Sequence, residues 1–186
     1  MDSSRSYRRS SRGELARSPA KTGSSPLIKL LPLPPSRRIG WQQPEERGSR
    51  VLISISTSKL KTSVKKNNVN PVWNEDLTLT VSDPIHPLKL QVFDKDLFSR
   101  DDKMGDAEID IHSFVEATKL NLSNIPNGTV ITTVRPNRHN CLADESAIVW
   151  RDGTVVQDII VRLKNVESGE LELQLSWINL SQASGS

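Results

Sequence analysis

From residue 51 onward, apolar and polar side chains alternate with a period of two over most of the chain. This pattern is typical of strands in which one face packs on a core and the other meets water. It is cleanest near the end of the chain, where Leu171, Leu173, Leu175 and Trp177 share one face. The pattern predicts strands at Val51–Ile55, Lys59–Val64, Asp76–Val81, Leu88–Phe93, Asp106–Ile111, Thr129–Arg135, Ala147–Trp150, Val155–Leu163 and Leu171–Trp177. So many short strands indicate an all-β fold, an antiparallel β-sandwich.

One segment departs from the period of two. The stretch His112–Leu122 carries an apolar stripe at helical spacing that includes Phe114, Val115 and Leu122. This spacing predicts a short helix, with Ser113 as its N-terminal cap.

The first fifty residues differ from the rest in composition and charge. They contain 11 Lys and Arg against 4 Asp and Glu, whereas residues 51–186 contain 14 against 18, so the formal net charge of +3 averages a basic segment and an acidic one. Ser, Arg, Pro and Gly fill 29 of these fifty positions, which predicts a mostly disordered segment. A solvated tail, an organelle transit peptide and a basic arm for nucleic acid or anionic lipid all fit its Arg and Ser run. Its one apolar patch, Pro26–Leu33, can supply an edge strand.

Composition excludes several classes of protein. No run of 18 uncharged apolar residues predicts a membrane-spanning helix, and the single cysteine, Cys141, permits no disulfide within the chain. The three histidines are far apart in sequence, and no glycine-rich phosphate loop is present. We therefore expect no enzyme activity of its own. The lone thiol and the absence of a signal peptide favour a cytoplasmic location.

Five carboxylates crowd into residues 94–106, directly after the predicted strand that ends at Phe93. So many carboxylates repel one another in a folded loop unless a cation neutralises them. Calcium fits best because the available ligands are all oxygens. An EF-hand loop starting at Asp94 is excluded, since it needs Gly and Glu where the chain has Ser99 and Gly105. A phosphatase of the Asp-x-Asp-x-Thr type is disfavoured because it needs alternating helices behind a parallel sheet. A calcium site and a solvated acidic turn both remain.

Two motifs in combination resemble the core of a C2 domain, the calcium- and lipid-binding eight-stranded sandwich. The motif Asn70-Pro-Val-Trp-Asn-Glu75 precedes a predicted strand, and Phe93-Asp-x-Asp96 follows it at a characteristic separation, with Asp102 and Gly105 beyond. The stretches Lys59–Thr62, Asn70–Leu79, Phe98–Glu108, Asn140–Ser146 and Trp150–Asp158 are similar to the plant C2-domain abscisic-acid-related proteins, also described as small C2 GTPase-activating proteins. The likeness covers roughly residues 51–180 and is most specific in 112–158, which resembles an insertion peculiar to this branch.

The resemblance implies a set of site residues. Asp94, Asp96 and Asp102 match the calcium ligands of the third top loop of a C2 domain. Bound calcium turns such a site from negative to positive, so that it attracts anionic phospholipid.

Two further pairs of residues match lipid-binding positions. Lys59 and Lys61, on one face of their strand, match a lysine-rich cluster that holds phosphoinositide headgroups; a solubilising device on an edge strand explains them equally well. Leu97 and Phe98 at the loop tip match residues that enter the lipid interface, and an ordinary packed or partly exposed loop is the alternative.

The chain departs from the family at the first top loop. A C2 domain contributes two aspartates there, the second in an Asp-Pro-Tyr that opens a strand, where this chain reads Gly48-Ser49-Arg50. We therefore expect a missing or replaced first strand, with Leu27–Leu33 taking its place, and an incomplete calcium site of low affinity. Glu45 and Glu46 are the nearest acidic residues, and residues 1–50 look like a replacement of the family's opening, as an alternative transcript or start would produce.

The resemblance divides the chain into a basic, disordered segment 1–50, a C2 domain 51–180 and a tail 181–186. It implies an adaptor that binds anionic phospholipid, with calcium as its cofactor, and recruits abscisic-acid receptors to the plasma membrane. Its locations would be the cytoplasm, the plasma membrane and the nucleus, and nucleic acid is not expected as a partner. One alternative is an activator of a YchF-type, Obg-like GTPase, with Arg135 and Arg138 as candidate arginine fingers. The other is a truncated form with impaired binding of calcium and lipid.

Overall fold

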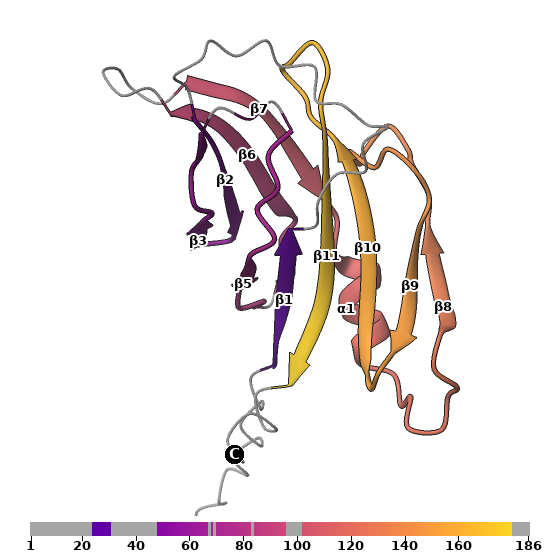
Figure 1. Cartoon of the computed structure of the whole chain (residues 1–186). Helices are drawn as coiled ribbons and strands as arrows, with labels where there is room; N and C mark the ends of the chain where they lie inside the picture. The colour runs from indigo at the N-terminus through magenta and orange to yellow at the C-terminus, as the bar shows by residue number, and fades with distance from the viewer. Residues whose placement is uncertain are drawn as a thin grey trace, which may run out of the picture.

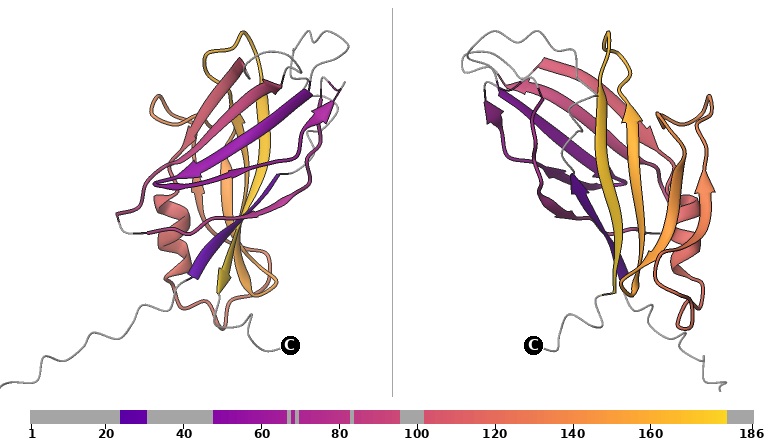
Figure 2. Two further views of the ribbon diagram at one scale, coloured as in Figure 1. Left: turned by 90° about the vertical axis from the view of Figure 1, so that its left-hand side faces the viewer. Right: turned by 45° about the vertical axis from the view of Figure 1, so that its right-hand side comes forward.

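The computed structural model describes residues 24–30, 48–66, 68, 70–82, 84–95 and 102–179, which form two antiparallel sheets and one helix (Figures 1 and 2). The strands are β1 (Ser24–Leu30), β2 (Gly48–Ile55), β3 (Ser58–Lys61), β4 (Lys65–Lys66), β5 (Asp76–Thr78), β6 (Leu88–Lys95), β7 (Asp102–Ile109), β8 (Thr129–Val134), β9 (Ser146–Arg151), β10 (Thr154–Arg162) and β11 (Glu170–Asn179), and the helix is α1 (His112–Thr118). None of the helical segments in these ranges is long and apolar enough to cross a membrane.

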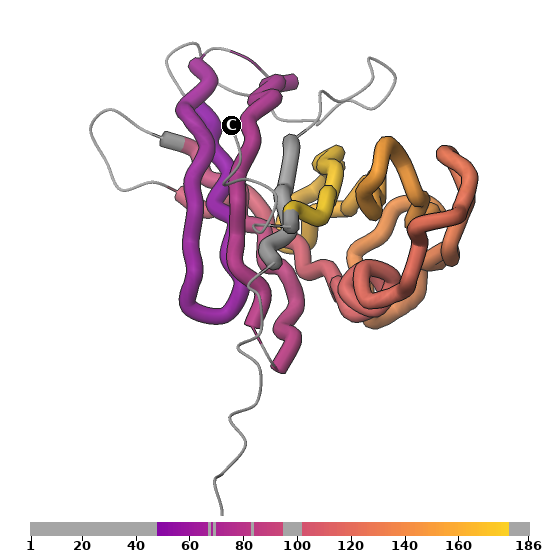
Figure 3. The backbone as a smooth tube through the Cα atoms, turned by 90° about the horizontal axis from the view of Figure 1, so that it is seen from below, coloured from indigo at the N-terminus to yellow at the C-terminus, as the bar shows by residue number. Residues whose placement is uncertain are grey.

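The predicted all-β sandwich is confirmed. One sheet has six strands in the order β5-β1-β11-β10-β9-β8, and the other has β3-β2-β6-β7 with β4 also paired to β2. Seen from below, β2 and β3 (purple) lie on one side of the molecule and β8 to β11 (orange to yellow) lie on the other (Figure 3). The described residues form eleven strands, against the nine that alternation predicted from residue 51 onward and the eight of the C2 domain that the chain resembles. The two strands beyond the nine are β1, from the N-terminal patch, and the short β4, which pairs with β2.

A side chain ends the predicted strand Lys59–Val64 early, at Lys61. The Val51 amide donates to the Thr62 Oγ1 hydroxyl (3.0 Å), and the Thr62 amide donates to the Val51 carbonyl (2.9 Å). A buried hydroxyl thus replaces one backbone acceptor of the ladder, so regular pairing stops at Lys61 and resumes at Lys65.

The N-terminal patch provides a strand, as predicted, but β1 begins at Ser24, three residues before the predicted Leu27–Leu33, and residues 31–33 lie outside the described residues. Strand β1 lies between β11, which it pairs along its whole length, and β5, which it pairs over Leu27–Lys29. It is therefore an interior strand, not the edge strand that its prolines suggested. Pro26 lies beyond the stretch paired with β5, which is where a strand tolerates proline.

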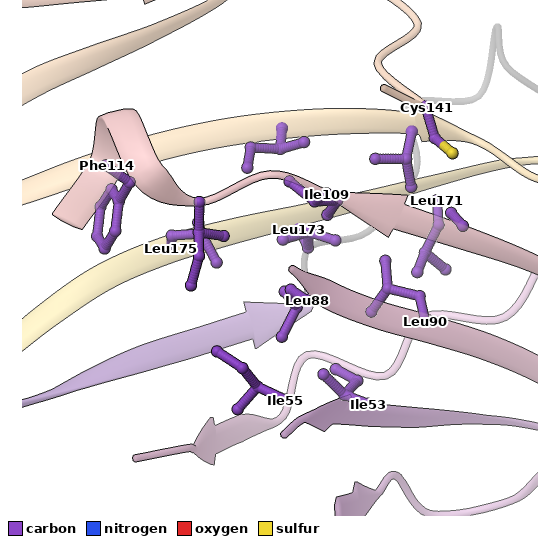
Figure 4. Packing of buried hydrophobic residues seen from close by; sticks show 14 of the residues in the cluster. Ile53, Ile55, Leu88, Leu90, Ile109, Phe114, Cys141, Leu171, Leu173 and Leu175 are labelled. Carbon is purple, nitrogen blue, oxygen red and sulfur yellow. The ribbon is translucent and has the colours of Figure 1, made fainter. Parts of the chain in front are cut away.

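The core fills the space between the two sheets. Alternate residues of β2, β6 and β11 point inward and are buried, as the period of two predicted (Figure 4). The labelled side chains are Ile53, Ile55, Leu88, Leu90, Ile109, Phe114, Cys141, Leu171, Leu173 and Leu175. Burial of such aliphatic side chains contributes about 1.5–3 kcal/mol each, which holds the sheets together without a disulfide.

Helix α1 is shorter than predicted and is not capped by Ser113. Its N-cap residue is Ile111, and the carboxylate of Asp110 accepts a hydrogen bond from the His112 amide (2.9 Å). The serine lies within the first turn, too late in the chain to cap it. The rings of Phe114 and Trp177 lie 6.4 Å apart at 60°, and this tilted contact fixes the helix against β11.

Candidate functional site

Three polar residues on neighbouring strands form a row at one end of the five-stranded sheet. Ser49 of β2 is the register partner of Asp94 on β6, and Asp94 is the register partner of Asp102 on β7. Register partners on adjacent strands point to the same side, with Cβ atoms about 4.5–5.5 Å apart. We call Ser49, Asp94 and Asp102 the polar row.

The polar row closes the end of the hydrophobic core. Ser49 is fully buried and Asp94 is 4% exposed, while Asp102 is exposed. The next inward-facing pair along the same strands is Val51 and Val92, both fully buried. The buried side chains of Ser49 and Asp94 therefore border the apolar core on one side, and Asp94 neighbours the exposed carboxylate of Asp102.

The structure brings together two of the three predicted calcium ligands. Asp94 and Asp102 are cross-strand neighbours, whereas Asp96 lies outside the described residues, as do Leu97 and Phe98. Within the described ranges, no group of three or more His, Cys, Asp or Glu side chains is close enough to hold a metal ion. The residues present fit calcium in kind, because they offer only oxygen ligands. The assignment of Asp94, Asp96 and Asp102 as ligands stays a prediction.

The Asn-Pro-Val-Trp-Asn-Glu motif has a structural role beside the polar row. The Trp73 indole Nε1 donates to the Ser63 carbonyl (3.0 Å), and the Glu75 carboxylate accepts from the Ser63 amide (3.0 Å) and from its hydroxyl. Glu75 Oε1 also lies 4.0 Å from the Lys65 ammonium. These contacts hold β4, and with it Lys65, which is the register partner of Ser49 on its other side.

Gly48 occupies the place where the family carries its first-loop aspartate, and the space there is closed. A Cβ atom added to Gly48 would lie 2.5 Å from Val64 Cγ1. An aspartate therefore does not fit unless Val64 moves.

A lysine face lies on the outer side of the same sheet. Lys59 of β3 and Lys89 of β6 both pair with Ser54 of β2, and Lys61 follows two residues after Lys59. All three lysines are exposed. We call Lys59, Lys61 and Lys89 the lysine face. Because β3 is an edge strand of its sheet, the two interpretations of Lys59 and Lys61 remain open.

Sequence reasoning missed Lys89. The residue sits in a predicted strand with ordinary alternation, and only the register of β2 with both neighbours shows that it joins the other two lysines. On its other side, Lys89 is opposite Glu108 of β7, so an acidic residue borders the lysine face on the β7 side.

The predicted insertion forms a surface at the other end of β7. Strand β7 runs away from the polar row, and α1 begins three residues after it ends (Figure 1). Leu120 is 54% exposed there and lies between two hollows. A hollow of about 570 Å³ includes Trp150 and Trp177 in its lining, and one of about 420 Å³ lies between α1 and β8 and includes Ile131.

Asp106 ties β7 to the loop after β10. Its carboxylate accepts hydrogen bonds from the Lys103 ammonium (2.7 Å) and the Asn165 amide (2.8 Å), and its backbone exchanges two hydrogen bonds with Lys164. The hydrogen bonds from Lys103 and Asn165 hold the pKa of this carboxyl below its usual value. The charge of Asp106 is thus used within the fold and is not available to a cation at the polar row.

Comparison with known proteins identifies the domain. Residues 46–126 match the family model of the C2 domain. The chain is 56% identical to Protein C2-DOMAIN ABA-RELATED 5 of Arabidopsis thaliana over 70% of its own length and 65% of that protein's length. It is 53% identical to Protein C2-DOMAIN ABA-RELATED 3 of the same plant, over 73% of its own length and 80% of that protein.

A third relative carries a different name, and a solved structure has the same fold. GTPase activating protein 1 of Oryza sativa subsp. japonica is 47% identical over 73% of the chain and 81% of that protein. Among solved structures, a chain that holds two C2 domains of Extended-Synaptotagmin 2 superposes with a TM-score of 0.59 and 19% identity, over 94% of this chain and 48% of that one. The structural match shows the sandwich fold.

Proposed function

Because the chain belongs to the plant family of C2-domain ABA-related proteins, we propose that it is a peripheral membrane adaptor. It binds anionic phospholipid at the polar row and the lysine face, and it recruits abscisic-acid receptors through the insertion. The observation that carries this proposal is the placement of the polar row and the insertion at opposite ends of β7. The lysine face lies on the outer side of the same sheet, where Lys89 is opposite Glu108 near the α1 end of β7. A bilayer that contacts the polar row therefore leaves the far end of β7 accessible to a protein.

Calcium contributes by changing the charge at the polar row. Asp94 and Asp102 would hold the ion together with Asp96, and the bound ion supplies positive charge that anionic lipid can approach. Without the first-loop aspartates the ligand count is low, so we expect the affinity for calcium to be below that of a complete C2 domain. The lysine face gives a second, calcium-independent route to the same lipids.

Vesicle sedimentation separates these two routes. The probe is vesicles of phosphatidylserine and phosphatidylcholine, with calcium or with a chelator. Asp94→Asn should abolish only the calcium-dependent part, while the control Glu145→Gln, an exposed acid within the insertion, should change nothing. Absence of vesicle binding in both conditions would refute the proposal.

Replacement of the lysine face tests the calcium-independent route. Each lysine near an anionic surface contributes about 1 kcal/mol, so Gln at Lys59, Lys61 and Lys89 together should weaken binding in chelator by about 100-fold. A matched control removes three cations from the insertion, at Lys119, Arg138 and Arg151. Equal losses in both variants would point to net charge alone and against a defined lysine face.

Recruitment of receptors rests on the exposed surface around Leu120. A protruding leucine between two hollows offers a partner both an apolar anchor and pockets for its own side chains. Leu120→Glu should abolish co-precipitation of an abscisic-acid receptor and leave vesicle binding intact. Val72→Glu, which charges an exposed apolar residue outside the insertion (41% exposed), is the control and should have no effect.

Activation of a GTPase is a second candidate function. One relative is named GTPase activating protein 1, and Arg138 is an exposed arginine that a GTPase could contact. Arg138 is exposed on the loop after β8, whose shape is fixed by hydrogen bonds from the Asn137 amide to Asn140 Oδ1 (3.0 Å) and from Asn140 Nδ2 to the Arg135 carbonyl (3.0 Å). Arg135 is instead paired with Glu145 (3.0 Å). An unchanged rate of GTP hydrolysis by a YchF-type GTPase with Arg138→Ala would remove this arginine from consideration.

A further inference from the structure

Ser49 is the polar side chain whose position the fold leaves unexplained. It is fully buried, and its Oγ atom has no hydrogen-bond partner among the residues that the structure describes. A buried hydroxyl without a partner costs about 1–3 kcal/mol, so an apolar residue would suit this position better if it served packing alone. The position therefore points to a ligand that the hydroxyl contacts.

The register indicates where such a ligand would lie. Ser49 points to the same side of the sheet as Asp94, directly across the β2–β6 pair, and Asp94 is followed by Asp102 on β7. Adjacent strands lie about 4.8 Å apart, and oxygens around a calcium ion lie about 2.3–2.6 Å from it, so ligands on neighbouring strands can reach one ion. Ser49 belongs to the same row as the two carboxylates and approaches it from the strand that opens with the missing aspartate.

The surroundings favour a cation over an apolar or anionic ligand. Both other members of the polar row are carboxylates, and the ammonium of Lys65, on the far side of Ser49, is within 4.0 Å of Glu75. Gly48, one residue earlier, carries no side chain, and a Cβ added there would lie 2.5 Å from Val64 Cγ1. Ser49 is thus the oxygen-bearing side chain that β2 presents to the row.

We propose that Ser49 Oγ is a ligand of the calcium ion held by Asp94 and Asp102. It supplies a contact from β2 one residue after the position of the family's first-loop carboxylate and on the other side of the strand. This inference rests on the calcium site of the proposed function and adds a residue to it. A neutral hydroxyl brings less charge than a carboxylate. The site therefore keeps a ligand from β2 but holds calcium more weakly than a complete C2 domain.

The test is a calcium titration of the full chain by calorimetry, without lipid. Ser49→Ala should weaken calcium binding by about three- to tenfold, which is the effect of losing one neutral oxygen contact. Ser49→Thr, which keeps the Oγ atom, should restore most of the affinity. Ser54→Ala, on the outer side of the same strand, is the matched control and should bind like the unchanged protein.

Thermal unfolding gives a second readout that needs no binding heat. Ser49→Asp adds a carboxylate beside Asp94, so it should lower the melting temperature in chelator and increase the rise that calcium produces. If Ser49→Ala is poorly folded, the comparison of Ser49→Thr and Ser49→Asp with the unchanged protein decides the matter.

Three results would overturn the assignment of Ser49. They are calcium affinity unchanged in Ser49→Ala, an equal loss in Ser54→Ala, and no calcium binding by the unchanged chain up to about 10 mM. Vesicle sedimentation in the same buffers distinguishes failure of the proposed function. Calcium binding that depends on Ser49 without vesicle binding would leave the ligand assignment in place and remove the membrane role.

Discussion

Substitution of Gly48 by alanine tests the packing that replaces the family's aspartate. The added Cβ would lie 2.5 Å from Val64 Cγ1, about 1 Å short of an ordinary carbon contact. Gly48 has no positive φ, so alanine is conformationally allowed and would otherwise stabilise the strand by about 0.4–1 kcal/mol. Overpacking of this kind costs about 1–3 kcal/mol, and we expect a net loss of about 1–2 kcal/mol in the free energy of unfolding.

A double-mutant cycle with Val64→Ala isolates the contact. Urea denaturation of Gly48→Ala, Val64→Ala and the pair should show that the pair is more stable than the sum of the single effects predicts, by about 1–2 kcal/mol. Coupling below about 0.5 kcal/mol, or a Gly48→Ala variant at least as stable as the unchanged protein, would refute the steric argument. If the coupling is found, Gly48→Asp should be tolerated only together with Val64→Ala.

Three other predictions concern the stability of the sandwich. Thr62→Val should cost about 1–3 kcal/mol because the buried Val51 amide loses its acceptor, and Thr62→Ser should restore most of it in urea denaturation. Deletion of residues 1–30 should lower the melting temperature by about 5 °C or more because β5 and β11 lose their shared partner, whereas deletion of residues 1–23 should not. Because the folded-state pKa of Asp106 is lowered, its stabilising effect is fully present above the unfolded pKa of about 3.9 and is lost as pH falls through the folded value. Asp106→Asn should therefore destabilise by up to about 1 kcal/mol at pH 7, and the difference should shrink steadily as pH falls below about 3.9 in urea denaturation.

The alternation of side chains predicted the strands because burial on one face is a local property of the sequence. Residues 171–177 alternate in the structure as they do in the sequence, and their inward leucines are buried. Strand ends were less predictable, because they depend on contacts with distant residues. The break at Thr62 requires knowledge that its hydroxyl accepts from Val51, eleven residues away.

The candidate site was predictable where it consists of a motif and not where it depends on register. Asp94 and Asp102 stand out as carboxylates at a characteristic spacing, so sequence reasoning found both. Ser49 and Lys89 are ordinary residues in ordinary strands, and they become informative only when β2 is paired with β6. In the sequence, the hydroxyl of Ser49 looks like any group that faces solvent, whereas the structure places it in the buried end of the core.

The distance between the two proposed binding regions limits how they can influence each other. The eight residues of β7 span about 26 Å between the polar row and α1, so neither calcium nor lipid at the row would contact a partner at Leu120. Coupling between distant sites requires a structural element with two arrangements, whose equilibrium both ligands shift. Strand β7 is not such an element, because it is paired with β6 and is held at Asp106 by Lys103 and Asn165. Under the proposed function, calcium should therefore leave the affinity for a receptor in solution unchanged. It should raise receptor capture only when vesicles are present, because a shared membrane increases the effective concentration of the two proteins.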